Sequence, residues 1–242
     1  MSQIMIKGSN GKAEPVLKVQ PEELNPWMAL SRITAGLQPV APKTPLETTD
    51  IRNLIRVVEG SVRVMRQMME FRDPYTAGHQ SRVSRICVEI ATEMGLSAFK
   101  IKGIELAALV HDVGKLAIPD EILNKPGQLT KSEFEAIKTH PTVGYEIINV
   151  VEFPWPVAKT VLQHHERMDG SGYPNQLADQ DILLEARILA VADVIDAMSS
   201  NRPYRASLGI GLALEEICLN KHKLYDADVV DASLAYYAAN NC

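Results

Sequence analysis

Two adjacent histidines begin the stretch His164-His165-Glu166-Arg167-Met168-Asp169-Gly170-Ser171-Gly172-Tyr173-Pro174. The residues that lead into it, near 155–166, are predicted to be helical, and one long loop is predicted around residues 167–184. Gly170 and Gly172 permit the backbone conformations that a loop lining a ligand needs, and Pro174 stiffens the loop. The stretch therefore predicts a helix end that presents two imidazoles beside a shaped loop.

Four other short segments that contain histidine or aspartate lie before and after this stretch. They are Asp73-Pro74-Tyr75-Thr76-Ala77-Gly78-His79, His111-Asp112-Val113-Gly114-Lys115, Lys138-Thr139-His140-Pro141 and Ala192-Asp193-Val194-Ile195-Asp196. Successive histidine or aspartate positions are separated by 24 to 32 residues, about one helix plus its connection. At this spacing each helix of a bundle can present one ligand group to a shared central point.

Helical patterns dominate from Thr48 onward. Thr48, Thr49 and Asp50 can cap a first helix, and Thr130-Lys131-Ser132-Glu133 is a capping-box pattern. The apolar stripe of the first helix consists of Ile51, Leu54, Ile55, Val58, Val62, Met65 and Met69. Further helices are predicted over Val83–Met94, from Ser97 to near His111, and near 142–150, 185–200, 209–220 and 227–239. Alternating strand patterns are scarce, so the predicted fold class is all-α, a compact multi-helix bundle.

Residues 1–47 differ from the rest of the chain. Six of the fourteen prolines lie in this segment, at Pro15, Pro21, Pro26, Pro39, Pro42 and Pro45. Such spacing prevents long helices and central strands. We therefore expect an irregular Pro-rich N-terminal arm over residues 1–47 and a folded catalytic domain over residues 48–242.

Composition and charge exclude several classes of protein. The net charge of −5 argues against a partner that is a nucleic acid polymer or a membrane surface. The longest stretch without a charged residue has 11 residues, Ala232–Cys242, which is too short to span a bilayer. No secretory signal is visible, and three widely spaced cysteines give no disulfide framework. A reducing, cytoplasmic setting is the simplest expectation.

The mixture of imidazoles and carboxylates indicates a metal site. These ligands suit borderline divalent ions such as iron, manganese, nickel, cobalt or zinc. No cysteine joins the set, which disfavours a closed structural zinc site. Five imidazoles and two carboxylates exceed what one ion that also holds water needs, so two ions bridged by a carboxylate are predicted.

His111-Asp112 followed by Gly114-Lys115 resembles the HD phosphohydrolase superfamily, and residues 164–174 resemble the signature of its HD-GYP subfamily. The resemblance covers roughly residues 50–240 and implies an HD-type helical bundle. It also implies a bacterial second-messenger phosphodiesterase that hydrolyses cyclic di-GMP to pGpG and/or GMP. In the mechanism that it implies, a hydroxide bridging two metals attacks the phosphodiester in line.

The resemblance also implies the metal ligands. One ion would be held by His79, His111, Asp112 and Asp193, and Asp112 would bridge to a second held by His140, His164 and His165. Some relatives use a Glu one helical turn before the first histidine to support a third ion. This chain has Tyr75 at that position, so two ions are expected.

Further residues are implied to contact the substrate or assist the reaction. Lys115 would contact the scissile phosphate. Asp196 follows Asp193 by one helical turn and so faces the same side, where we expect it to pair with Lys115 or help to transfer a proton. Arg202 and Arg205 carry guanidinium groups suited to phosphate oxygens. Gly172 and Tyr173 would line the substrate, with the Tyr173 ring stacked on a guanine base.

Three functions remain open on the sequence. The first is hydrolysis of cyclic di-GMP, the second is hydrolysis of 3′,3′-cyclic GMP-AMP, and the third is a non-catalytic sensor of cyclic dinucleotides. Signalling proteins are candidate partners of the Gly172-Tyr173-Pro174 loop. The predicted helix over Asp50–Phe71 either forms a homodimer or packs on its own domain.

Overall fold

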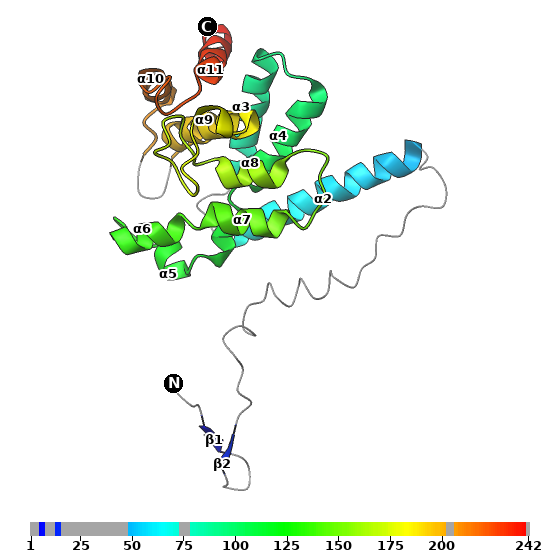
Figure 1. Ribbon diagram of the computed structural model, residues 1–242, viewed down its shortest axis with the longest axis vertical. Helices are drawn as coiled ribbons and strands as arrows, with labels where there is room; N and C mark the ends of the chain where they lie inside the picture. The colour runs from blue at the N-terminus through cyan, green and yellow to red at the C-terminus, as the bar shows by residue number, and fades with distance from the viewer. Residues whose placement is uncertain (1–4, 8–12, 16–47, 73–77, 202–205, 241–242) are drawn as a thin grey trace. The chain divides into compact units, whose positions relative to one another are not determined.

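The computed structural model describes residues 5–7, 13–15, 48–72, 78–201 and 206–240 (Figure 1). The chain divides into two compact units, Met1–Ile51 and Arg52–Cys242. The boundary between them lies four residues beyond the boundary predicted after residue 47.

In the first unit, strand β1 (Met5–Lys7) pairs with strand β2 (Ala13–Pro15) in antiparallel register, with Ile6 opposite Glu14. The prediction of an irregular arm missed this pair. Its proline does not prevent pairing, because Pro15 is the last residue of its strand, where a missing N–H disrupts the ladder least.

The second unit is helical in the part that the structure describes, and the predicted all-α fold is confirmed. Its first α-helix, α2 (Thr48–Arg72), begins four residues before the boundary. The α-helices that follow are α3 (His79–Glu93), α4 (Ala98–Val110), α5 (Asp120–Leu123), α6 (Lys131–Ile137), α7 (His140–Ile148), α8 (Val157–Gln163), α9 (Leu184–Ser199), α10 (Ile210–Leu219) and α11 (Ala227–Asn240). Two short 3-10 helices, η3 (Val113–Ala117) and η4 (Asp179–Asp181), lie between them.

Local signals in the sequence fix several helix ends. The Ser97 side chain accepts a hydrogen bond from the backbone of Lys100 at the start of α4. Thr130 and Glu133 form the predicted capping box at the start of α6. Gly95 follows α3 with a φ of +69°, a left-handed conformation that glycine adopts without strain.

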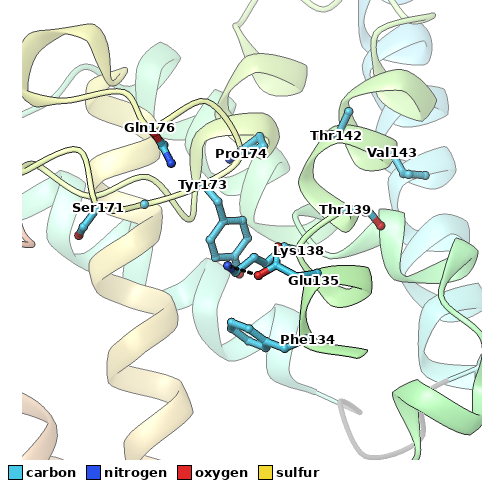
Figure 2. A pocket seen from close by; sticks show the side chains of 11 residues that line it. Phe134, Glu135, Lys138, Thr139, Thr142, Val143, Ser171, Tyr173, Pro174 and Gln176 are labelled. Atoms are coloured by element: carbon cyan, nitrogen blue, oxygen red, sulfur yellow. Dashed lines mark hydrogen bonds and ion pairs between the residues drawn. The ribbon is translucent and has the colours of Figure 1, made fainter. Parts of the chain in front are cut away.

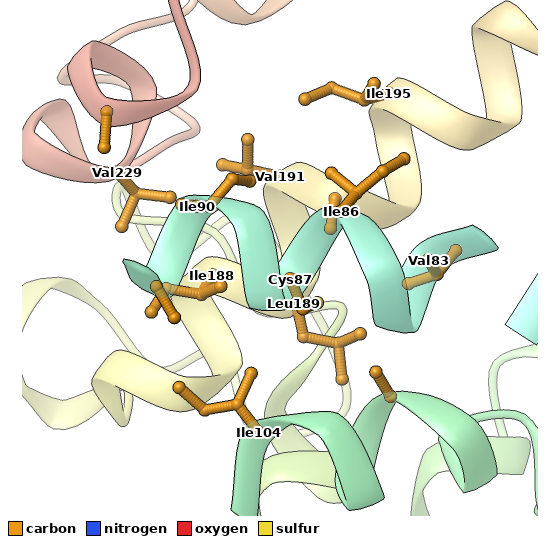
Figure 3. Close-up of a cluster of buried hydrophobic side chains, with 14 of the residues drawn as sticks. Val83, Ile86, Cys87, Ile90, Ile104, Ile188, Leu189, Val191, Ile195 and Val229 are labelled. Atoms are coloured by element: carbon orange, nitrogen blue, oxygen red, sulfur yellow. The ribbon is translucent and has the colours of Figure 1, made fainter. Parts of the chain in front are cut away.

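Two hydrophobic clusters hold the bundle together. In the first, α3 and α9 cross with α4 and α11 beside them, and Ile90, Ile104 and Leu189 are completely or almost completely buried (Figure 3). In the second, Leu106 of α4 and Val161 of α8 pack with residues of α2 and α7. These contacts fix the helix ends that carry the histidines.

Helix α2 uses the predicted apolar stripe for packing on its own domain. Val62 and Met69 are buried in the second cluster, and Met65 packs against it. The side chains of Ile51, Leu54 and Ile55 lie outside the described part of the chain. A second apolar face of α2 is exposed at Val57, Val64, Met68 and Phe71, of which Phe71 is 89% exposed.

Within the described residues, the helices are all too short or too polar to cross a lipid bilayer.

Candidate metal centre

The structure brings together the seven residues that the sequence singled out as metal ligands. Most of them lie at helix ends: His79 begins α3, His111 follows α4, and His140 begins α7. His164 follows the last residue of α8, and Asp193 points inward from α9. We call the seven residues the histidine–aspartate cluster; they are His79, His111, Asp112, His140, His164, His165 and Asp193.

Three imidazoles of the cluster are oriented in the same way. Nδ1 of His111 donates to the carbonyl oxygen of Ala108 at 2.7 Å, three residues earlier in the chain. His140 and His164 donate likewise to carbonyl oxygens three residues earlier, at 2.7 and 2.6 Å. Because Nδ1 carries the proton, the lone pair on Nε2 is free to face the centre of the cluster.

One half of the cluster joins α3, α4 and α9. Nε2 of His79 lies 3.3 Å from Oδ1 of Asp193, and Nε2 of His111 lies 4.0 Å from the same oxygen. These three residues offer ligand atoms that all lie within 4.8 Å of one another. Two nitrogens and one oxygen at this separation form a set that can hold a divalent ion.

The other half consists of imidazoles alone. His140, His164 and His165 offer ligand atoms within 4.8 Å of one another, and Nε2 of His140 lies 3.3 Å from Nε2 of His164. Nitrogen atoms this close, without a proton between them, favour a shared cation.

Asp112 lies between the two halves. Its Oδ2 is 3.4 Å from Nε2 of His111, and its Oδ1 is 3.5 Å from Nε2 of His140. The Asp112 side chain is 2% exposed, so its two oxygens are held in this orientation by the surrounding protein. One carboxylate that faces both halves has the geometry of a bridging ligand.

The charge states fit metal binding. Burial lowers the pKa of His140 to about 4, and it also holds the pKa of His164 and His165 well below the usual range. Burial alone would raise the pKa of Asp112, but the positive charge of Lys115 and the nearby imidazoles hold it well below its usual value. At neutral pH the cluster therefore offers an ionised carboxylate at Asp112 and three neutral imidazoles, those of His140, His164 and His165.

His79 is held differently from the other histidines. Burial would lower its pKa, but hydrogen bonds to Asp193 and Asp196 outweigh this effect and raise the pKa to about 9. The proton on His79 thus balances the negative charge of Asp193 and Asp196. A bound metal ion can supply this positive charge in place of the proton.

Asp196 has other partners than the predicted one. Its Oδ2 accepts a hydrogen bond from Nδ1 of His79 at 2.7 Å, and Arg82 donates to both of its oxygens at 2.6 and 3.1 Å. The predicted pairing of Asp196 with Lys115 is wrong, because Nζ of Lys115 donates to Oδ2 of Asp112 at 2.8 Å. Asp196 therefore orients His79, and its role in proton transfer stays a prediction.

Gly114 carries a packing role that the sequence reading missed. A Cβ atom at this position would overlap the carbonyl oxygen of His140 and lie 2.6 Å from the backbone nitrogen of Gly144. Helix α7 therefore approaches η3 as closely as it does only because residue 114 lacks a side chain. The available signal was the glycine within the His111–Lys115 signature itself.

The loop after His165 is fixed by close packing and by one buried carboxylate. A Cβ atom at Gly172 would lie 2.5 Å from both the nitrogen of Arg167 and the carbonyl oxygen of His165. The Glu166 carboxylate accepts hydrogen bonds from the backbone of Asn175 at 2.7 Å and of Leu177 at 3.0 Å. The sequence analysis did not predict that Glu166 holds the loop, although Glu166 lies within the stretch 164–174.

This packing places Tyr173 beside the cluster. The backbone nitrogen of Tyr173 donates to the carbonyl oxygen of His165 at 3.2 Å. Its ring stacks on the His165 imidazole, with centroids 4.8 Å apart and an interplanar angle of 30°. Arg202, Arg205 and Tyr75, which the sequence also singled out, lie outside the described residues.

Replacing Glu166 with Gln is expected to loosen the loop of residues 166–177. The amide has one acceptor oxygen and no charge, so at least one of the two charge-assisted hydrogen bonds is lost, which costs about 1–3 kcal/mol. Limited proteolysis should cut this loop faster in the variant than in the parent protein. Glu152→Gln serves as the control, and equal cleavage rates in the two variants would contradict the assignment.

Comparison with known proteins places the chain in a family. A family model described as HD domain matches residues 63–229. The chain belongs to the HD domain family. The resemblance to the HD superfamily that residues 111–115 indicate is confirmed.

The match to a named relative covers less than half of that relative's chain. The cyclic di-GMP phosphodiesterase response regulator RpfG of Xanthomonas campestris is 44% identical over 168 residues, which cover 69% of this chain and 44% of RpfG. The chain therefore spans less than half the length of this curated relative.

Solved structures share the fold. A cyclic GMP-AMP-specific phosphodiesterase of Vibrio cholerae is 29% identical with a TM-score of 0.54, over 87% of this chain and 46% of that one. Bd1817 of Bdellovibrio bacteriovorus, described as an HDG"Y"P protein, is 19% identical with a TM-score of 0.55, over 66% and 51% of the two chains. The latter likeness supports the fold.

Proposed function

We propose that the chain is the catalytic domain of a metal-dependent phosphodiesterase that hydrolyses cyclic di-GMP to pGpG and/or GMP. The observation that carries the proposal is the arrangement of two sets of ligand atoms with Asp112 between them. The similarity to RpfG, which is named as a cyclic di-GMP phosphodiesterase, supports the choice of substrate.

Two divalent transition metal ions fit the residues present. His79, His111 and Asp193 would hold one ion, His140, His164 and His165 the other, and Asp112 would bridge them. Nitrogen and carboxylate donors without a thiolate suit iron, manganese, nickel, cobalt or zinc. When bound, such a pair supplies activation of water and stabilisation of charge on a phosphodiester.

The residues of the chain itself bind and orient the substrate. The Lys115 side chain is 25% exposed, and its ammonium lies beside Asp112, where it can donate to a non-bridging phosphate oxygen. Asp196 and Arg82 hold the His79 ring in place. Tyr173 and Gly172 lie on the loop beside His165, with the Tyr173 ring available to a base, and Arg202 and Arg205 are proposed to bind phosphate.

Two other functions are kept as alternatives. Hydrolysis of 3′,3′-cyclic GMP-AMP is favoured by the likeness to the phosphodiesterase of Vibrio cholerae. A non-catalytic sensor is disfavoured because all seven predicted ligands are present and lie together. Protein partners at the loop of residues 172–174, a homodimer and a cytoplasmic setting stay predictions.

The proposal is tested by metal analysis together with product chromatography on cyclic di-GMP and 3′,3′-cyclic GMP-AMP. We expect bound transition metal, cleavage of cyclic di-GMP to pGpG or GMP, and loss of cleavage by at least about 100-fold after chelation. Restoration of the metal should restore the activity. Tight nucleotide binding without metal or cleavage would instead establish the sensor, and faster cleavage of the mixed dinucleotide would establish the second alternative.

A further inference from the structure

A groove of about 690 Å³ opens beside the histidine–aspartate cluster (Figure 2). One wall is formed by α6 and the start of α7, and the other by the loop that contains Tyr173. Its lining mixes aromatic, charged and hydroxyl side chains, among them Phe134, Glu135, Lys138, Thr139, Tyr173 and Gln176. Lys138 and Thr139 belong to the signature that ends in His140-Pro141, and no role in metal binding is assigned to either.

The centre of the groove is a lysine held between two rings. Nζ of Lys138 lies 5.0 Å from the centroid of the Phe134 ring and 5.6 Å from that of Tyr173 (Figure 2). The same ammonium donates to Oε1 of Glu135 at 2.9 Å. An ammonium that lies near two aromatic rings is thus paired with a carboxylate.

The groove adjoins the reaction centre through Tyr173. This ring stacks on His165 of the cluster and also lines the groove. Thr139, another lining residue, directly precedes His140. A dinucleotide whose phosphate lies at the cluster would therefore direct an attached base into the groove.

The groove suits a base of the dinucleotide better than it suits a phosphate. The Glu135 carboxylate, whose side chain is 56% exposed, would repel a phosphate, whereas the two aromatic faces suit a flat heterocycle. Phe134 as a residue is 46% exposed, so it presents apolar surface to water. Aromatic faces together with paired charges are suited to a purine.

We propose that this groove is the binding site for one guanine base of the substrate and that Glu135 and Lys138 recognise it. This inference rests on the proposed function. The Glu135 carboxylate accepts hydrogen bonds from N1–H and the N2 amino group of guanine, and the Lys138 ammonium donates to O6 or N7. Adenine offers the carboxylate no such pair, because its N1 is an acceptor and C2 carries only hydrogen.

The test compares Glu135→Gln and Lys138→Gln with two matched controls that lie outside the groove, Glu146→Gln on α7 and Lys131→Gln on α6. For each metal-loaded protein, kcat and KM are measured on cyclic di-GMP and on cyclic di-AMP, and binding of cyclic di-GMP is measured by calorimetry on the same preparations. We expect a rise in KM for cyclic di-GMP of about 10- to 100-fold in the two groove variants, with kcat changed less than about twofold. The ratio of kcat/KM for cyclic di-GMP to kcat/KM for cyclic di-AMP should fall by a similar factor.

The outcomes separate this inference from the proposed function. If the parent protein cleaves cyclic di-GMP and the groove variants match the controls in KM and in preference, the inference is overturned and the function stands. If no protein cleaves but the groove variants alone bind cyclic di-GMP more weakly, the guanine site is supported and the function is overturned. If the parent protein neither cleaves nor binds cyclic di-GMP, both are overturned.

Discussion

Replacing Asp112 with Asn is expected to lower metal content by more than half and to reduce hydrolysis of cyclic di-GMP by about 1,000-fold or more. Asp112 is the only residue of the cluster whose side-chain oxygens lie near both halves, at 3.4 Å from His111 and 3.5 Å from His140. The amide keeps the size of the side chain but loses the charge and one acceptor oxygen. A neutral residue cannot bridge two cations or offset their charge.

The measurements are the metal content of the purified protein and steady-state hydrolysis on the same preparation. Asp231→Asn is a matched control, because Asp231 forms an exposed ion pair with Lys221 at 2.6 Å, in helix α11. Circular dichroism should show that both variants keep the helical content of the parent protein. Parent-like metal content and turnover in Asp112→Asn would refute the bridging role.

Replacing Gly114 with Ala is expected to destabilise the fold by about 3 kcal/mol and to abolish most of the activity. The added methyl group meets the carbonyl oxygen of His140 and the backbone nitrogen of Gly144, and backbone cannot rotate away as a side chain can. Helix α7 must then shift away from η3 and carry His140 with it. A domain of this size should lose about 10 °C in its unfolding temperature.

Gly60→Ala provides the matched control. Gly60 lies within α2, and a Cβ atom built there has no neighbour within 4 Å. Alanine favours a helix over glycine, so this variant should be more stable by about 0.5–1 kcal/mol. Thermal unfolding followed by circular dichroism measures both changes. The close-approach argument fails if Gly114→Ala unfolds at the temperature of the parent protein.

The helical class and the identity of the ligands could be predicted because their signals are local. The capping box at Thr130 and Glu133 and the glycine after α3 each involve residues that are close in the chain. Imidazole and carboxylate groups retain their preference for metals wherever they lie. The hairpin of β1 and β2 escaped prediction because strands of three residues carry too little pattern.

Contacts between distant residues could not be predicted in this way. His79 and Asp196 lie 117 residues apart in the chain, and Arg82 and Asp196 lie 114 apart, so no local pattern pairs them. The spacing along α9 correctly predicts that Asp196 lies on the same face as Asp193. It does not predict that the partners of Asp196 lie on α3. The lysine expected to pair with Asp196 contacts Asp112 instead.

The sequence by itself determined that this protein is a helical bundle with seven candidate metal ligands, because residue chemistry and helical periodicity are properties of the chain. Only the tertiary structure decided which ligands form each half, why residue 114 has no side chain, and how Glu166 fixes the loop. It also decided that Lys138 and Glu135 lie in a groove with Tyr173. The physical reason is that these contacts depend on how helices pack, and packing joins residues that no local sequence signal connects.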